Sequence, residues 1–490
     1  MRFGVPTAPQ RSAYRNEHPC ETRMSQLTPS KKLAYGVAEI GGSLSFAAVN
    51  AWLLYFLINI ARLEPLAAGT VFIIGRLFDA FLDPAMGIVS DRTKVRWGRK
   101  FFIKWGALPL GVSFALLWIA PGNGRSAVFG LVLTRLLFFS LLYTVVQMPY
   151  LALTPELAPD YDDRTRLSSY RAAFGTVAGL LAFALPPTIV LTLAPASGLA
   201  ASSPRGWFGL GVIFGAVTAL SYLVMTAIVP EPSRPPQVTP KSRVAPWREF
   251  RSTLRITGFR EIIVIFITIA VGSMIASSIL PFYLESALHL PGGQQSFILA
   301  LLFGVAVLTL PIWNFVSAQL GKRLTLILGL ILLSSSLMAL VLGAGDGISP
   351  FLIIMIIPAG IGLSAQLLLP WAMLPDIVEF DELQHGRRRE GLIYALFTFG
   401  QKIAGSLGVF VNAIVAALAG YQQGVVIQAP HTVQAIRLMV GPVAAVLFLT
   451  AAALAWRYPI TRKQHERTRA LLKRPADRKV PREGTVDDEA

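Results

Sequence analysis

The chain has 490 residues, of which 54% are hydrophobic and only 14% are charged, and its formal net charge is +17. Because a soluble domain carries about 25% charged residues, this composition excludes an ordinary soluble protein. The basic residues are spread along the chain with no interleaved aromatic residues, which argues against nucleic acid as a partner and favours contact with anionic membrane lipid.

The chain opens with a polar tail, residues 1–32, which lacks an apolar core of the signal-peptide type. Apolar runs long enough to cross about 30 Å of hydrocarbon then recur along most of the chain. They predict an all-α membrane protein with twelve transmembrane helices, at residues 33–60, 66–90, 101–120, 127–154, 168–195, 207–229, 258–288, 294–319, 323–343, 349–374, 389–419 and 433–457.

Two aspartates, Asp79 and Asp83, stand one helical turn apart in the second span, shortly after Arg76. A spacing of four places both carboxylates on one helix face. A charge at membrane depth costs roughly 3 kcal/mol, and two carboxylates in a low dielectric need a shared proton, an arginine or a bound cation. The pair is therefore a candidate coupling-ion site, and a metal site for Na+ if the ion is sodium.

Spans four and five add three polar side chains. Thr144 can offer a hydroxyl oxygen to a small cation, since hard ions prefer oxygen ligands. A threonine in a membrane helix otherwise bonds to its own backbone. Gln147 and Arg171 are polar enough that we expect them to face a cavity rather than lipid.

A Pro-rich basic segment, residues 230–257, reads as a cytoplasmic linker between two six-helix bundles. The bundles are residues 33–229 and 258–457, and a basic tail follows at 458–490. Transporters built from two such halves bind their substrate between them, near the middle of the membrane.

Lys402 lies deep in the eleventh span, where its ammonium cannot easily reach the membrane surface. A buried lysine needs a carboxylate or loses its proton. Asp79 and Asp83 are the natural partners across the seam between the halves. A purely structural ion pair between helices is the alternative.

Four further charged residues fall within or near the ends of predicted spans. We expect Arg135, Glu285 and Arg437 to extend to the membrane surface, since each lies close to a predicted span end. Glu39, about one turn into the first span, can face either the surface or the interior.

Spans four and ten both end in a proline followed by an acid, Glu156 in span four and Asp376 in span ten. Basic residues follow each of these two acids. We interpret Asp91, Glu156, Asp376 and Arg387 as a cytoplasmic gate whose acids and arginines pair between the halves. Such surface pairs are worth at most about 1 kcal/mol, which suits a gate that must reopen. Solvated loops are the alternative.

The distribution of charge predicts the orientation. The loop at 91–104 and the link at 231–257 hold six Lys/Arg each and the tail from 457 holds ten, whereas the opposite loops show only Arg62, Arg125 and Arg205. By the positive-inside rule, both termini lie in the cytoplasm and the protein is a multi-pass component of the cell (inner) membrane.

The sequence offers no constellation for catalysis. Cys20 is the only cysteine, which excludes an internal disulfide and a cysteine-based metal site. No Gly-Lys-Ser/Thr phosphate loop is present, so ATP does not drive the protein directly. We expect a monomer that is not an enzyme and has no cofactor beyond a coupling ion, Na+ or H+.

Several motifs resemble the glycoside–pentoside–hexuronide:cation symporters of the major facilitator superfamily, the family of melibiose permease. They are the stretches from Arg76 to Gly87, Asp91 to Arg99, Pro149 to Glu156 and Arg389 to Tyr394. The resemblance implies that Asp79 and Asp83 are the cation-site carboxylates, Thr144 a cation-site hydroxyl, Lys402 the essential lysine, Arg76 the arginine beside the site and Arg171 an arginine of the sugar site.

The chain departs from that family where the sugar is bound. Ser43 and Gln147 stand where the sugar-permease pattern has aspartates, and Leu151 stands where it has a tryptophan. The departures leave the implied cation site in place and put galactoside recognition in doubt.

A second branch is also similar, the sodium-dependent lysophosphatidylcholine symporters of animals, and it moves an amphipathic lipid. The similar stretches are Leu369–Asp376, Leu280–Tyr283, Ala419–Gln422 and Tyr458–Ile460. The sequence therefore predicts a cation-coupled symporter of a small organic solute, a sugar or a glycoside, with a lysophospholipid transporter or flippase as the alternative. A receptor or scaffold would have no reason to keep buried charge.

Overall fold

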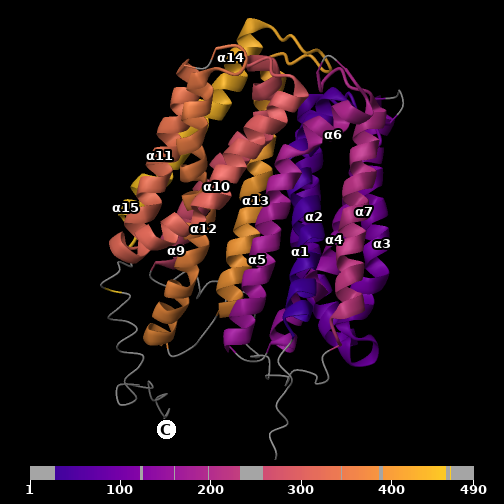
Figure 1. The fold of residues 1–490 in the computed structure, drawn as a ribbon, viewed down its shortest axis with the longest axis vertical. Coiled ribbons are helices and arrows are strands. Elements are labelled where there is room, and N and C mark those ends of the chain that lie inside the picture. The colour runs from indigo at the N-terminus through magenta and orange to yellow at the C-terminus, as the bar shows by residue number, and fades with distance from the viewer. Residues whose placement is uncertain are drawn as a thin grey trace, which may run out of the picture.

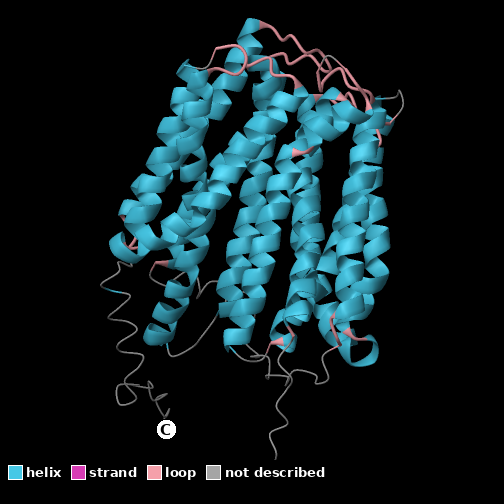
Figure 2. Cartoon of the chain, in the orientation of Figure 1, coloured by secondary structure: helices cyan, strands magenta, loops and turns pink. Residues whose placement is uncertain are grey.

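The computed structural model describes residues 28–121, 125–158, 161–196, 198–231, 258–343, 345–385, 390–459 and 464. Most of the predicted tails and linker, and the gate candidate Arg387, lie outside these residues. The described part is almost wholly helical, with its loops gathered at the two ends of the bundle (Figure 2).

The two halves of the chain form two helical bundles side by side (Figure 1). The first half contains α1 (Pro29–Asn59), α2 (Pro65–Trp97), α3 (Arg99–Leu117), α4 (Arg125–Leu157), α5 (Tyr161–Ala184), α6 (Pro186–Leu193) and α7 (Pro204–Ile228). The second half contains α9 (Phe259–Phe282), the π-helical turn η1 (Tyr283–Ala287), α10 (Gly292–Leu320), α11 (Lys322–Gly343), α12 (Pro350–His385), α13 (Glu390–Leu418), α14 (Pro430–Leu438), the π-helical turn η2 (Met439–Val443) and α15 (Ala444–Trp456).

Proline opens several of these helices, including α1, α6, α7 and α14. Proline suits the first turn because the N–H that it lacks would have no intrahelical partner there. Among the described residues, eleven helices are long and apolar enough to cross a membrane, or up to twelve if the bent pair α5 and α6 counts as one span.

The fifth span is not the continuous helix predicted for residues 168–195. It bends by 48° between α5 and α6, where Pro186 and Pro187 follow Leu185. Proline cannot donate to the preceding turn and its ring clashes with it, so the helix breaks there. Hydropathy alone could not separate a bent span from a straight one.

Large apolar side chains face outward around the bundle. Phe81, Leu308 and Leu418, for example, are 78%, 78% and 83% exposed. A soluble protein rarely exposes large apolar side chains in such numbers to water. Inside the first half, Trp52, Trp118 and Trp207 are fully buried, and the last two stack at 5.7 Å. The outer surface is therefore suited to hydrocarbon.

The same joint recurs in both halves. Gly98 (φ 72°) separates α2 from α3, and Gly321 (φ 82°) separates α10 from α11; both lie in the left-handed region that favours glycine. The residue after each glycine bonds to an acid on the fourth helix of its own half. Arg99 Nε lies 2.8 Å from Glu156, and Lys322 Nζ lies 2.6 Å from Asp376.

Four helix pairs make up most of the seam between the halves. Helix α1 packs on α9, α2 on α13, and both α5 and α6 on α10. We call the end where α1 begins and α15 stops the tail end, and the opposite end the far end. Of the polar residues singled out in the sequence, Ser43 belongs to α1, Arg76, Asp79 and Asp83 to α2, Arg171 to α5 and Lys402 to α13, which are helices of the seam, whereas Thr144 and Gln147 belong to α4.

Candidate functional site

The two aspartates of α2 have different partners. Arg76 Nη1 donates to Asp79 Oδ2 at 3.2 Å, one turn away on the same helix. Both residues are buried, at 8% and 7% exposure. Arg76 therefore supplies the countercharge that Asp79 needs at this depth.

Asp83 is instead bound across the seam. Lys402 of α13 donates from Nζ to Asp83 Oδ2, and Thr144 of α4 donates from Oγ1 to Asp83 Oδ1 at 3.1 Å. The side chains of Lys402 and Asp83 are 19% and 22% exposed. The structure thus brings together Asp83, Thr144 and Lys402, and it assigns Lys402 to Asp83 rather than to Asp79.

A small cavity of about 20 Å³ adjoins Asp79. We call it the small cavity; its lining includes Phe46, Arg76, Asp79, Ser140 and Tyr143. About 10–15 Å³ suffices for one water-sized occupant. Within the described residues, Asp79 Oδ1 is buried and has no hydrogen-bond partner, so a proton, a water or a small cation would satisfy it.

No cluster of three His, Cys, Asp or Glu side chains that could hold a metal occurs in the part of the chain that the structure describes. Asp79, which lines the small cavity, has one oxygen without a partner among the described residues, and Ser140 and Tyr143 add hydroxyl groups to the lining. Such a set suits a monovalent hard ion or a proton, because multivalent metals draw on more charged ligands.

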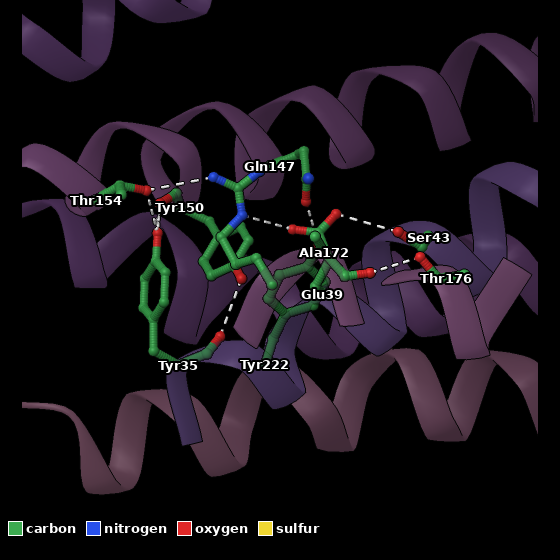
Figure 3. Close-up of polar contacts among 10 residues, drawn as sticks. Tyr35, Glu39, Ser43, Gln147, Tyr150, Thr154, Ala172, Thr176 and Tyr222 are labelled. Atoms are coloured by element: carbon green, nitrogen blue, oxygen red, sulfur yellow. Dashed lines mark hydrogen bonds and ion pairs between the residues drawn. The ribbon is translucent and has the colours of Figure 1, made fainter. Parts of the chain in front are cut away.

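A second polar cluster joins α1, α4 and α5 (Figure 3). Arg171 Nε donates to Glu39 Oε2 at 3.0 Å, and Ser43 Oγ donates to Glu39 Oε1 at 3.1 Å. Arg171 Nη1 also donates to Thr154 Oγ1 at 3.3 Å. Glu39, left open between surface and interior by the sequence, is thus the carboxylate at the centre of this cluster.

Gln147 is predicted to face a cavity, but it is not in the lining of the small cavity or of the two larger cavities. It accepts a hydrogen bond from Tyr222 and is buried at 5% exposure. Tyr35 and Tyr150 complete the network, each donating from its hydroxyl to the other's backbone carbonyl at 2.9 Å. The guanidinium of Arg171 lies over the Tyr150 ring, with Cζ 5.6 Å from the ring centre.

A cavity of about 620 Å³, the central cavity, opens on this cluster. Glu39, Ser43 and Arg171 line it from the first half. Helices α10 and α12 of the second half line it with apolar side chains alone, namely Phe303, Ala306, Val307, Leu310, Leu367 and Trp371. The central cavity therefore has one polar wall and one apolar wall, and it lies between the halves.

A further cavity of about 320 Å³, the apolar pocket, adjoins the central cavity. The two share Phe183, Phe303, Leu367 and Trp371, and the rings of Phe183 and Phe303 stack across the seam at 4.2 Å. Side chains of α9, α10, α11 and α12 supply most of the lining of the apolar pocket. Together the two cavities suit a solute with one polar end and one apolar end.

The far end joins the halves by hydrogen bonds. Glu285 of η1 accepts from the Tyr55 hydroxyl of α1 and from the Ala200 backbone N–H at 2.9 Å. Asn59 Oδ1 accepts from the Tyr421 hydroxyl at 3.1 Å. We call these contacts the far-end seal.

The predicted placement of Glu285 at the membrane surface is wrong, because its side chain is buried at 2% exposure. It satisfies its oxygens with donors from the first half instead of reaching water. The guanidiniums of Arg135 and Arg437 bond to backbone carbonyls, of Ile119 and Ala287, rather than extending freely.

The gate candidates Asp91, Glu156 and Asp376 belong to helices and not to solvated loops. Asp91 and Glu156 both pair with Arg99, at 2.7 and 2.8 Å, and Asp376 pairs with Lys322. Each of these pairs lies within one half. Pairing between the halves remains a prediction for a state with the tail end closed, and Arg387 lies outside the described residues.

Sequence reasoning missed Asn50 of α1. Its Oδ1 accepts from Arg76 Nη2, and its Nδ2 donates to the Phe46 carbonyl at 2.8 Å. A lone asparagine in an apolar span is itself a signal, because an unsatisfied amide is costly in hydrocarbon. Its partner on α2 could not be identified without the packing of α1 against α2.

The family model described as MFS/sugar transport protein matches residues 34–462. An uncharacterized symporter of Synechocystis sp. is 29% identical, over 90% of this chain and 96% of its own length. The isoprimeverose transporter of Lactiplantibacillus pentosus is 27% identical, over 80% and 81%. The sodium-dependent lysophosphatidylcholine symporter 1-A of Danio rerio is 25% identical, over 91% and 88%.

Solved structures share the fold. A nucleoside transporter superposes with a TM-score of 0.65, covering 86% of this chain and 99% of its own, at 14% identity. The xylose transporter of E. coli superposes with a TM-score of 0.60, covering 90% and 99%, also at 14% identity. These likenesses confirm the predicted fold of two six-helix bundles.

Proposed function

Because this chain belongs to the MFS/sugar transport protein family, we propose that it couples the symport of a small organic solute to Na+ or H+ by alternating access. Fold and family make it a multi-pass membrane transporter of the MFS type. The proposal adds the coupling ion, the class of cargo and the residues that serve each.

The observation that carries the proposal is that Asp79 lines the small cavity and that its buried Oδ1 has no hydrogen-bond partner among the described residues. A cation or proton bound there would neutralise the part of the Asp79 negative charge that Arg76 leaves uncompensated. The same occupant would weaken the electrostatic repulsion between Asp79 and Asp83. It would also weaken the attraction that the two carboxylates together exert on the Lys402 ammonium. Since Lys402 belongs to the opposite half, ion binding then changes the seam that must move.

The polar wall of the central cavity supports a sugar or glycoside as the cargo. Glu39 can accept from hydroxyl groups, and Arg171 can donate to ring or glycosidic oxygens. Ser43 adds a third group that can donate or accept. Isoprimeverose, named for one relative, belongs to this class of ligand.

A lysophospholipid is the second candidate, and the apolar pocket favours it. A lipid chain could enter that pocket, through the residues shared with the central cavity, while its headgroup meets Glu39 and Arg171. A purely polar sugar would leave the apolar pocket unused, whereas an aryl or alkyl glycoside would use both cavities.

We further propose that the tail end is cytoplasmic, since the basic segments lie there. The far-end seal would then close the outer mouth. The central cavity extends along α5 from Phe183, near the far end, to Ser168, near the tail end. The conformation described is accordingly proposed to be inward-facing.

Uptake into proteoliposomes tests the proposal. The purified protein is offered hexoses, pentosides, alkyl glycosides and lysophosphatidylcholine under an imposed Na+ or H+ gradient. At least one of these should accumulate only with a gradient, and Asp79→Asn should abolish that dependence because it removes the carboxylate charge to which the ion is proposed to bind. Asp346→Asn, in an exposed pair with His289, is the matched control and should behave as the parent.

Two results would count against the proposal. Accumulation in Asp79→Asn with the cation dependence of the parent would overturn the assignment of the ion site. If no member of the panel is driven by either gradient, cation-coupled symport of this cargo class is wrong.

A further inference from the structure

Two residues of α1 lie between the small cavity and the apolar pocket. Phe46 lines both. Asn50, one turn later, lines the apolar pocket and accepts a hydrogen bond from Arg76, which lines the small cavity. The site proposed for the ion and a site proposed for the cargo thus share a wall one side chain thick.

We infer that Asn50 is a positioning residue that couples the occupancy of the small cavity to the shape of the apolar pocket, acting through Arg76. The inference rests on the proposed function and extends it, because it names the element through which the ion and the cargo sense each other. It concerns α1 and α2 of a single half and is independent of the Asp83–Lys402 pair.

The guanidinium of Arg76 contacts three neighbouring side chains. Nη1 bonds to Asp79 Oδ2 at 3.2 Å, Nη2 bonds to Asn50 Oδ1, and Cζ lies 4.7 Å from the centre of the Phe46 ring. A guanidinium presents its donors as a rigid fork. Any displacement toward one neighbour therefore changes the contact with the other two.

Asn50 is well placed to respond to such a displacement. Its amide is oriented by the bond from Nδ2 to the Phe46 carbonyl at 2.8 Å, and the residue is only 6% exposed. Little water can replace Arg76 at Oδ1, so the asparagine must follow the guanidinium or lose its partner.

The physical sequence follows from these contacts. With the small cavity empty, the full charge of Asp79 attracts Arg76. A cation or proton at Asp79 Oδ1 lowers that attraction, and Arg76 moves toward Asn50 and Phe46, which form the wall of the apolar pocket. By thermodynamic reciprocity, a solute that presses on this wall changes the affinity of Asp79 for the ion by the same factor.

A thiol reporter tests the inference. Cys20, the only cysteine, is replaced by serine, and Ser277→Cys places a thiol in the lining of the apolar pocket. The rate of its reaction with N-ethylmaleimide is measured in detergent while Na+ is titrated at fixed pH, and while pH is varied without Na+. Binding of radioactive sodium, or uptake of protons, is measured separately on the same protein.

In the parent, the cation should change the alkylation rate at position 277 by about fivefold or more, the lower end of ordinary coupling between sites. Asn50→Leu should still bind the cation while the change at position 277 falls below about twofold. Thr218→Val, which removes a buried hydroxyl that bonds to the Gly41 carbonyl of α1 away from both cavities, should keep the response of the parent.

Asn50→Asp separates positioning from general damage. It keeps an acceptor for Arg76 and adds a charge that competes with Asp79 for the guanidinium. The cation affinity of Asn50→Asp should rise relative to the parent. The cation affinity of Asn50→Leu should fall, because Arg76 then bonds to Asp79 alone and competes more strongly with the cation. A purely structural role would move both variants in the same direction.

The outcomes are distinct. An undiminished response at position 277 in Asn50→Leu overturns the inference and leaves the proposed function intact, as does a parent that binds the cation with no change at position 277. A parent that binds neither Na+ nor protons at Asp79 overturns the inference and the proposed function together.

Discussion

At the scale of residues, three acids near the seam each have a different base. Glu39 pairs with Arg171 and Asp79 with Arg76, both inside the first half, whereas Asp83 pairs with Lys402 across the seam. Breaking either of the first two pairs changes a binding surface, and breaking the third changes how the halves are joined. Loss of a charge therefore has a different readout in each case.

Glu39→Gln should weaken the binding of the cargo and leave the binding of the ion unchanged. A hydrogen bond to a charged group is worth about 1.5–3 kcal/mol, so the KM for the cargo should rise roughly tenfold or more while the cation concentration at half-maximal rate stays constant. Both are measured in gradient-driven uptake. Thr176→Val is the matched control, because Thr176 lines the central cavity but its hydroxyl bonds to the Ala172 carbonyl.

An equal rise in the KM for cargo and in the cation requirement would contradict this separation. It would place Glu39 in the coupling machinery and not on the cargo wall.

At the scale of elements, the far-end seal depends on short irregular segments. The π-helical turn η1 carries Glu285 inward, and the loop before α7 offers the Ala200 N–H. The α5–α6 bend at the same end places Thr188 of α6 2.8 Å from Ser296 of α10. Departures from straight helices thus bring polar groups of the two halves together.

Tyr55→Phe should loosen the far-end seal. It removes the hydroxyl that donates to the buried Glu285 carboxylate, a loss of about 1.5–3 kcal/mol, so the far end should open roughly tenfold more often. Ser286→Cys in a Cys20→Ser background reports the opening, since Ser286 is 1% exposed. Its alkylation by an impermeant maleimide should accelerate by that factor.

Tyr283→Phe is the control for this experiment. The Tyr283 hydroxyl bonds to the Leu340 carbonyl within the second half, so its loss should leave the alkylation rate at position 286 unchanged. Equal acceleration in both variants would mean that the tyrosine hydroxyls act on general stability and not on the seal.

Elements and sites differ in how far the sequence predicts them. Hydropathy is a property of each segment, so the spans and the intramembrane charges Asp79, Asp83 and Lys402 could be found from the sequence. The inward turn of Glu285 depends on Tyr55, which lies 230 residues away in the chain. Likewise, Asn50 and Arg76 meet only because α1 packs against α2. Contacts of this kind follow from tertiary packing and not from local pattern.

At the scale of the whole molecule, the two halves contribute unlike surfaces to one space. The first half supplies the charged cluster of Glu39 and Arg171, and the second half supplies the apolar lining of both cavities. An alternating movement of the halves would separate the polar and apolar walls. Cargo that contacts both would therefore favour one arrangement of the halves over another.

Side-specific labelling should reveal the orientation and the open mouth. Ser168→Cys, at an exposed position near the tail end of the central cavity, should react with an impermeant maleimide only from the cytoplasmic side in a Cys20→Ser background. Ala201→Cys, exposed at the far end, should react only from outside. The measurement compares intact cells with inside-out vesicles, and the reverse pattern would overturn the proposed orientation.

The twin joints at Gly98 and Gly321 relate the two halves of the chain. A glycine in the left-handed region, a base directly after it and an acid on the fourth helix recur in both halves with Arg99 and Glu156 in one and Lys322 and Asp376 in the other. Such a repeat is typical of transporters built from two related six-helix halves. The joints brace each half in the same way, whereas Glu39 and Arg171 belong to the first half and most of the apolar lining of the two cavities belongs to the second. The two halves thus share a joint and differ in the surface that each presents to the cavities.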